Sequence, residues 1–190
     1  MKIIFIDTTH PKLIKDLNYK GFICDQAYDK SRSEILKIIM NYDGIVIRSR
    51  FKIDKNFINA AKKLKFIARA GSGTENIDLH YANKKNIKCF NAAEGNRQAV
   101  AEHALAMILN LLNNIRVSDQ EIRTGIWDRE KNRGIELSGK TIGIIGFGNT
   151  GSSFAKILEN FNVKILAYDK YKEKYKFQSN LDEILELSDI

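Results

Sequence analysis

The chain has 190 residues, of which 44% are hydrophobic and 28% charged, with one proline and twelve glycines. This composition is typical of a soluble globular protein and excludes a disordered chain, and the length allows one domain or two small ones. The formal net charge is +8, a value that by itself would also suit a nucleic-acid or membrane partner.

The distribution of charge argues against both of those partners. Residues 1–95 carry 18 basic and 10 acidic residues, whereas residues 96–190 carry 13 of each, and no run of five like charges occurs. Scattered lysines are typical of a solvated surface, and a field that attracts small anions is the alternative. We therefore expect no nucleic acid and no membrane as a partner.

Cysteine usage and the N-terminus indicate a cytoplasmic protein. Cys24 and Cys89 stand far apart and fit neither a disulfide framework nor a zinc site, so buried thiols and no metal are expected. The opening MKIIFID is too short an apolar run for a signal peptide, and the later run AVAEHALAMILNLL is interrupted by polar residues.

Short apolar runs alternate with helical patterns over the first half of the chain. Strands are predicted at 2–6, 21–24, 44–49, 65–70 and 87–91, and helical patterns lie near 11–19, 33–41 and 59–64. Ser31 or Ser33 supplies an N-cap for the second helix, and Asp54 supplies one for the third. Runs this continuous predict an α/β fold whose parallel sheet is covered on both faces.

The pattern of apolar residues changes after Gly95. Residues 96–115 contain no glycine or proline and have apolar side chains on nearly all sides, which predicts a long helix buried between domains or subunits. A polar connector is expected at 117–140. A second βαβ unit follows, with strands at 141–147 and 163–169, helices at 150–160 and 181–187, and the start of a third strand at 188–190.

The most specific local motif is Gly146-Phe147-Gly148-Asn149-Thr150-Gly151, between the predicted strand and helix of this second unit. Its first glycine permits a tight turn, its second lets the backbone approach a pyrophosphate, and its third lets helix and strand pack closely. Asp169 ends the next strand, where an acid accepts hydrogen bonds from the adenosine ribose. The motif predicts dinucleotide binding, with NAD favoured over NADP and with Lys170 and Lys172 weakening that preference.

Two further groups lie at strand ends of the first half. The loop Gly71-Ser72-Gly73-Thr74 has backbone amides that suit a carboxylate, although a plain tight turn is the alternative. Arg48-Ser49-Arg50 ends the preceding strand, where two guanidiniums suit an anionic substrate, although an exposed strand end is the alternative. His10 and His80 have no assigned role, and His103 is expected to be a packed or interface imidazole.

Together these motifs resemble the NAD-dependent D-isomer-specific 2-hydroxyacid dehydrogenases, and within them the D-3-phosphoglycerate dehydrogenases of serine biosynthesis. The resemblance is carried in order by IVIRSRFKID, IARAGSGTENID, CFNAAEGNRQAVAEHALAMILNLL, GIWDR, LSGKTIGIIGFGNTGSSFA and LDEILELSDI. It implies a flavodoxin-like substrate domain over 1–95 and an incomplete Rossmann-type NAD-binding domain over 96–190. The long helix at about 96–115 would then contribute to a homodimer or higher oligomer.

The resemblance also implies roles for individual residues. Cofactor-binding roles fall to Gly146, Gly148, Asn149, Thr150, Gly151 and Asp169. Substrate-binding roles, toward a small anionic 2-hydroxy or 2-keto acid, fall to Arg48, Arg50, Ser72, Gly73 and Asn96. The family's catalytic Arg, Glu and His lie beyond the segment that matches LDEILELSDI, so no catalytic residue is expected in this chain.

We therefore expect the N-terminal part of a dehydrogenase that oxidises 3-phosphoglycerate to 3-phosphohydroxypyruvate, truncated at residue 190 and inactive by itself. Two alternatives stay open at this point. One is a non-catalytic NAD-binding or oligomerising remnant of the family, and the other is a decayed gene product without a stable fold.

Overall fold

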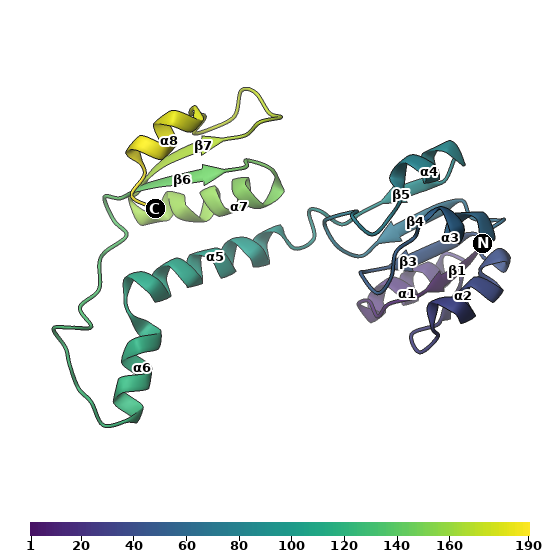
Figure 1. Cartoon of the computed structure of the whole chain (residues 1–190), viewed down its shortest axis with the longest axis horizontal. Helices are drawn as coiled ribbons and strands as arrows, with labels where there is room; N and C mark the ends of the chain where they lie inside the picture. Colours follow the sequence, from purple (N-terminus) through teal and green to yellow (C-terminus); the bar gives the residue numbers. More distant parts are fainter. The chain divides into compact units, whose positions relative to one another are not determined.

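A computed structural model describes all 190 residues, which form two compact units, Met1–Gly95 and Asn96–Ile190 (Figure 1). The first unit has a five-stranded parallel sheet in the order β2-β1-β3-β4-β5. Its strands are β1 (Lys2–Phe5), β2 (Ile23–Gln26), β3 (Gly44–Ile47), β4 (Phe66–Arg69) and β5 (Lys88–Phe90). This is the flavodoxin-like strand order, in which the chain reverses its direction across the sheet between β1 and β3.

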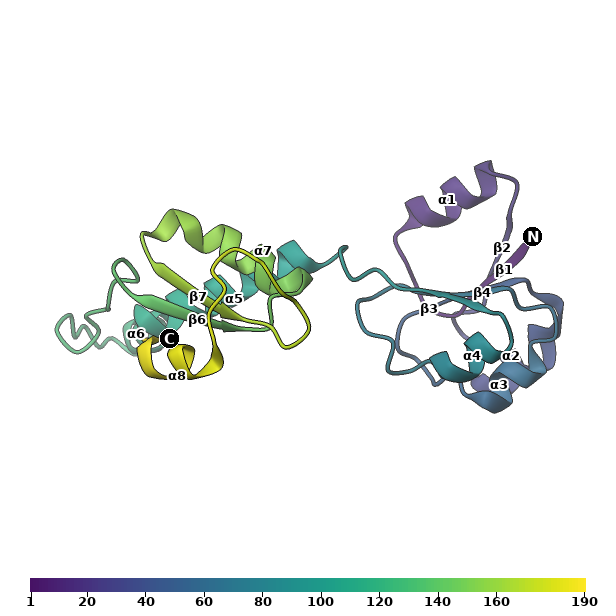
Figure 2. The ribbon, with the colours of Figure 1, turned by 90° about the horizontal axis from the view of Figure 1, so that it is seen from above.

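Helices cover both faces of this sheet (Figure 2). They are α1 (Pro11–Tyr19), α2 (Arg32–Ile38), α3 (Lys55–Ala60) and α4 (Leu79–Lys84), with a 3₁₀ turn at Ile39–Asn41. Ser31 caps α2 and forms a reciprocal capping box with Glu34, and the Asp54 side chain caps α3. The sequence allows either Ser31 or Ser33 as the N-cap of α2, and in the structure the cap is Ser31.

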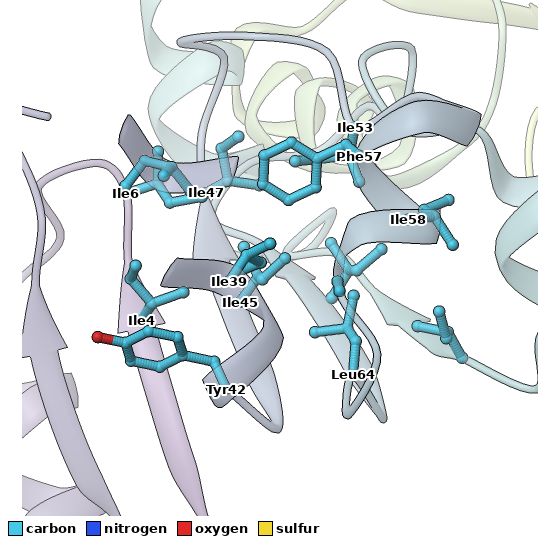
Figure 3. Packing of buried hydrophobic residues seen from close by; sticks show 14 of the residues in the cluster. Ile4, Ile6, Ile39, Tyr42, Ile45, Ile47, Ile53, Phe57, Ile58 and Leu64 are labelled. Atoms are coloured by element: carbon cyan, nitrogen blue, oxygen red, sulfur yellow. The ribbon is translucent and has the colours of Figure 1, made fainter. Parts of the chain in front are cut away.

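The core of the first unit explains why its strands are apolar without alternation. Ile4, Ile6, Ile45 and Ile47 turn to the face covered by α2, α3 and α4, where they meet buried aliphatic and aromatic side chains (Figure 3). Ile3, Phe5 and Val46 turn to the face covered by α1. Because both faces of the sheet are buried, side chains that point to either face are apolar. The strands therefore show no alternation of apolar and polar residues.

The second unit contains the parallel strands β6 (Thr141–Ile145) and β7 (Lys164–Tyr168) and the helices α5 (Arg97–Leu112), α7 (Asn149–Leu158) and α8 (Leu181–Leu187). A 3₁₀ turn lies at Glu159–Phe161. Helix α5 packs against α7, and both share a core with Ile142 and Ile144. A Cβ on Gly143 would lie 2.7 Å from Ile184 of α8, so a glycine is needed where α8 lies on β6. The predicted α/β class with parallel sheets is confirmed in both units.

The residues predicted to begin a third strand, 188–190, pair with β6 and not with β7. The third position, beside β7, is taken by the short segment around Gln178, which bridges Ala167 in parallel. Ile190 lies at the opposite edge, where it exchanges main-chain hydrogen bonds with Thr141 and Gly143 of β6. The segment beside β7 is too short and too polar to be recognised as a strand from sequence.

The prediction of a polar connector over 117–140 is wrong for its first residues, which are helical. Asn114 adopts a left-handed conformation with φ of 51° that ends the long helix, and α6 (Ile115–Arg123) follows it. Within this chain Ala101 is the one fully buried residue of α5, so burial of the long helix against a second subunit stays a prediction. None of the helices combines the length and the apolar character needed to span a membrane.

Candidate functional site

The loop at 146–151 joins β6 to α7, and its three glycines meet three different constraints. Gly146 has a φ of +99°, a left-handed conformation in which a side chain is strained. A Cβ on Gly148 would meet no atom within 4 Å, so the backbone is open there. A Cβ on Gly151 would lie 2.0 Å from the carbonyl oxygen of Gly146, so only glycine lets α7 pack this closely on the loop.

The N-terminus of α7 completes an anion-binding arrangement in this loop. Gly148 is the N-cap residue, and no side chain caps the helix. The amides of Asn149, Thr150 and Gly151 belong to the first turn, which has no intrahelical acceptors and carries the positive end of the helix dipole. A loop and helix of this kind bind phosphate groups through the backbone.

Asp169 follows β7, and its carboxylate is bonded both to the glycine loop and to its own turn. Oδ2 accepts a hydrogen bond from the amide of Phe147 at 2.7 Å, and Oδ1 accepts from the amides of Tyr171 and Lys172 at 2.8 and 3.1 Å. These amide bonds, led by that from Tyr171, lower the pKa of the Asp169 carboxyl below its usual value. The structure therefore brings the predicted ribose acid next to the predicted pyrophosphate loop.

Phe147, in the middle of the loop, is held by the segment that follows β7. Its carbonyl oxygen accepts a hydrogen bond from Lys172 Nζ at 3.0 Å, and its ring stacks on that of Tyr175 with centroids 4.9 Å apart. The Tyr175 hydroxyl in turn accepts from the amide of Asp169 at 2.6 Å and donates to the carbonyl of Ala167 at 3.2 Å. Sequence reasoning missed both contacts, because residues so far apart in the chain leave no local pattern.

In the first unit, the two predicted substrate arginines have different surroundings. The amides of Arg48 and Arg50 both donate to the carboxylate of Asp7, at 2.6 and 3.4 Å, which fixes the turn after β3. The guanidinium of Arg50 donates to three carbonyl oxygens, those of Ile6, Ala27 and Lys30, at 2.9, 3.2 and 2.6 Å. The guanidinium of Arg48 makes no hydrogen bond or ion pair, so its charge is available to a ligand.

Arg48 lines an open hollow of about 370 Å³ together with Thr8, Thr9, His10 and Ala70. These residues follow β1, β3 and β4, so the hollow lies where the strand order reverses, the usual ligand position in open α/β sheets. The hydroxyl oxygen of Thr9 is buried without a hydrogen-bond partner. Sequence reasoning did not assign the two threonines, because isolated hydroxyl residues form no motif.

The loop at 71–74 follows β4 and is shaped by an ion pair. Arg69 donates to Glu75 Oε1 at 3.0 Å and to the carbonyl oxygen of Arg48 at 3.2 Å. A Cβ on Gly73 would lie 2.0 Å from a Glu75 carboxylate oxygen, and a Cβ on Gly71 would lie 2.9 Å from the Arg69 guanidinium. The two glycines therefore leave room for this ion pair.

The remaining predicted residues divide between the units. The carbonyl oxygen of Ser72 accepts a hydrogen bond from Asn91 Nδ2 at 2.6 Å, which ties the loop to the segment after β5. Asn96 precedes α5 and belongs to the second unit. His103 is exposed on α5, so the expectation of a packed imidazole is not met within this chain, and an interface role stays a prediction.

Comparison with known proteins agrees with this geometry. The family model for the D-isomer-specific 2-hydroxyacid dehydrogenase catalytic domain matches residues 3–177. D-3-phosphoglycerate dehydrogenase of Archaeoglobus fulgidus is 35% identical over an alignment of 196 positions, which covers 100% of this chain and 37% of that protein. The human D-3-phosphoglycerate dehydrogenase is 34% identical over 88% of this chain and 32% of its own length.

Among solved structures, NAD⁺-bound 3-phosphoglycerate dehydrogenase of Entamoeba histolytica is similar with a TM-score of 0.76 and 29% identity, over 99% of this chain and 60% of that one. The chain spans about a third of the length of the curated relatives that it matches. Because the family model covers most of the chain, the chain belongs to the D-isomer-specific 2-hydroxyacid dehydrogenase family.

Proposed function

We propose that the protein is an NAD-dependent dehydrogenase of D-2-hydroxy acids and that its substrate is D-3-phosphoglycerate, oxidised to 3-phosphohydroxypyruvate. The observation that carries the proposal is the loop at 146–151, where Gly148 is open, α7 lacks a side-chain cap and Asp169 lies alongside. The names of the curated relatives support the substrate.

The residues of the second unit fit a dinucleotide. The amides at the start of α7 would hold the pyrophosphate, and the remaining acceptor capacity of the Asp169 carboxylate would serve the adenosine ribose. The negative charge of Asp169 would repel a 2′-phosphate, which favours NAD over NADP. The bound nicotinamide supplies the acceptor for the hydride at C2 of the substrate.

The residues of the first unit would bind the anionic ends of the substrate. The backbone of Ser72 and Gly73 suits the carboxylate, and Arg48, with its free guanidinium in the polar hollow, suits the phosphate. Arg50 would act on the phosphate only through the turn that it stabilises, since three carbonyls occupy its donors. This narrows the predicted pair of substrate arginines to Arg48.

The resemblance places the His that moves the proton, and the Arg and Glu that act with it, beyond the segment that matches LDEILELSDI. We therefore propose binding of NAD, rather than turnover, as the property of these residues by themselves. Two free cysteines suit a cytoplasmic location. The exposed apolar side chains on α5 and α6, among them Leu111, Ile115 and Ile122, suit a homodimer.

Two assays test the proposal. The first is a titration of the 190-residue protein with NADH, followed by nicotinamide fluorescence, in which saturable binding is expected and its absence contradicts the proposal. The second is an assay of the full-length protein with D-3-phosphoglycerate and NAD⁺. Oxidation by the full-length protein supports a dehydrogenase, whereas NADH binding without oxidation of any D-2-hydroxy acid supports a non-catalytic binding protein.

A further inference from the structure

We propose that Lys172 is a positioning residue for the dinucleotide and that it acts through the carbonyl of Phe147 in the glycine loop. The inference rests on the proposed NAD site and deepens it. It assigns a role to a side chain of the segment after β7 that neither the glycine motif nor the ribose acid contains.

The geometry fixes Phe147 at each of its polar groups and at its ring. Asp169 accepts from its amide at 2.7 Å, Lys172 Nζ donates to its carbonyl at 3.0 Å, and Tyr175 stacks on its ring with an interplanar angle of 20°. The Tyr175 hydroxyl is itself bonded to Asp169 and Ala167. All these contacts to Phe147 come from the residues directly after β7.

This arrangement matters because Phe147 lies between the turn glycine and the glycine that faces open space. Gly146 is held at a φ of +99° on one side, and Gly148 is without neighbours at its Cβ on the other. A loop whose central peptide is already fixed has less conformational freedom to lose on binding, which strengthens affinity. The Lys172 bond is the one contact on the Phe147 carbonyl that a side chain provides.

The two lysines beside Asp169 provide a matched pair for the test. Lys172 reaches the loop, whereas the Lys170 ammonium lies over the Tyr171 ring, 5.6 Å from its centroid, and makes no hydrogen bond to the loop. Replacing either one with methionine removes the same charge at nearly the same place, and only one replacement removes the bond to Phe147.

The experiment measures the Kd for NADH of the 190-residue protein and of its variants by fluorescence titration. Lys172→Met is expected to weaken binding roughly tenfold, the size of one hydrogen bond from a charged donor. Lys172→Arg, which keeps a donor of similar reach, is expected to restore the Kd to within about threefold, and Lys170→Met to leave it within about twofold. The melting midpoint without NADH reports whether Lys172→Met has merely unfolded the unit.

Each other result overturns the proposal. A wild-type Kd in Lys172→Met, with wild-type protein that binds NADH, contradicts the role of Lys172 and leaves the proposed function intact. Equal weakening by Lys172→Met and Lys170→Met shows a general charge effect instead. A loss in Lys172→Met that Lys172→Arg does not rescue, or that accompanies a lowered melting midpoint, shows a structural role only. No binding by wild-type protein contradicts both this inference and the proposed NAD site.

Discussion

Two glycine loops follow parallel strands in this protein, one in each unit, and they use glycine for different reasons. In the loop at 146–151, the constraint comes from the backbone, since a Cβ on Gly151 would strike the carbonyl of Gly146. In the loop at 71–74, the constraint comes from the ends of two ion-paired side chains, Arg69 and Glu75, of which Glu75 is exposed and can move. A glycine motif therefore predicts a local structure more reliably where a side chain at the glycine would clash with main chain than where it would clash with a movable side chain.

The largest effect is expected for Gly151→Ala. Its new Cβ would overlap main chain that cannot move aside, so we expect a loss of about 3 kcal/mol in the free energy of unfolding. NADH binding should weaken with it, since the helix would be displaced from the loop. Urea unfolding followed by circular dichroism and NADH titration are the measurements. Gly148→Ala is the matched control, because its Cβ meets no atom and its φ is −77°: it should keep stability and lose affinity.

A smaller effect is expected for Arg48 in the first unit. Arg48→Ala removes an unpaired guanidinium, so on the proposed function we expect the KM for 3-phosphoglycerate to rise roughly tenfold or more. The KM for an unphosphorylated 2-hydroxy acid should change little. An equal rise for both substrates would contradict the assignment of Arg48 to the phosphate.

Arg50→Ala should behave in the opposite way. It leaves three carbonyl oxygens without a charged donor, and because the residue is exposed we expect a cost of only about 1 kcal/mol in the free energy of unfolding. Arg48→Ala should cost almost none. The urea midpoints of the two variants, measured side by side, test this difference in stability. Equal midpoints would show that the hydrogen bonds of Arg50 do not stabilise the fold.

Acid should loosen the second unit through Asp169. The folded pKa of this carboxyl is below its ordinary value, so its stabilising bonds are fully present above about pH 4 and are lost as the pH falls through the folded pKa. NADH affinity of the wild-type protein should therefore be flat from neutral pH to about pH 4 and fall below it. In the Asp169→Asn variant this loss of NADH affinity at low pH should be smaller than in the wild-type protein. An unchanged loss would show that other carboxyl groups cause it.

The smallest effect is expected for Gly73→Ala, the counterpart of Gly151→Ala in the other loop. Its Cβ would meet the carboxylate of Glu75, whose side chain is 71% exposed and free to swing away. We expect a change of less than about 1 kcal/mol in the free energy of unfolding. In Glu75→Ala protein the same substitution should cost even less. A loss as large as that of Gly151→Ala would remove the distinction between the two loops.

These contrasts also show which parts of the protein were open to prediction from sequence. The strands and the first three helices of the first unit follow from apolar runs and caps, because both faces of the sheet are buried and Asp54 stands where a helix begins, whereas the short α4 was not predicted. The loop at 146–151 follows from its glycines, because their constraints are local to the backbone.

The features that sequence reasoning missed depend on contacts between distant parts of the chain. Arg50 was assigned to substrate because its position at a strand end is visible, whereas the three carbonyls that occupy it come from other segments. The segment around Gln178 forms too few ladder bonds to require a strand-like sequence. Helix α6 has a polar sequence with one apolar stripe, a pattern that is hard to distinguish from a polar connector.

The most direct test of the account is hydrogen–deuterium exchange of the 190-residue protein with and without saturating NADH. NADH should slow exchange at the amides of 147–152 and around Asp169, while the loop at 71–74 should be unchanged by NADH alone. Binding of NADH with no protection at 147–152 would contradict the central claim that the second glycine loop is the dinucleotide site.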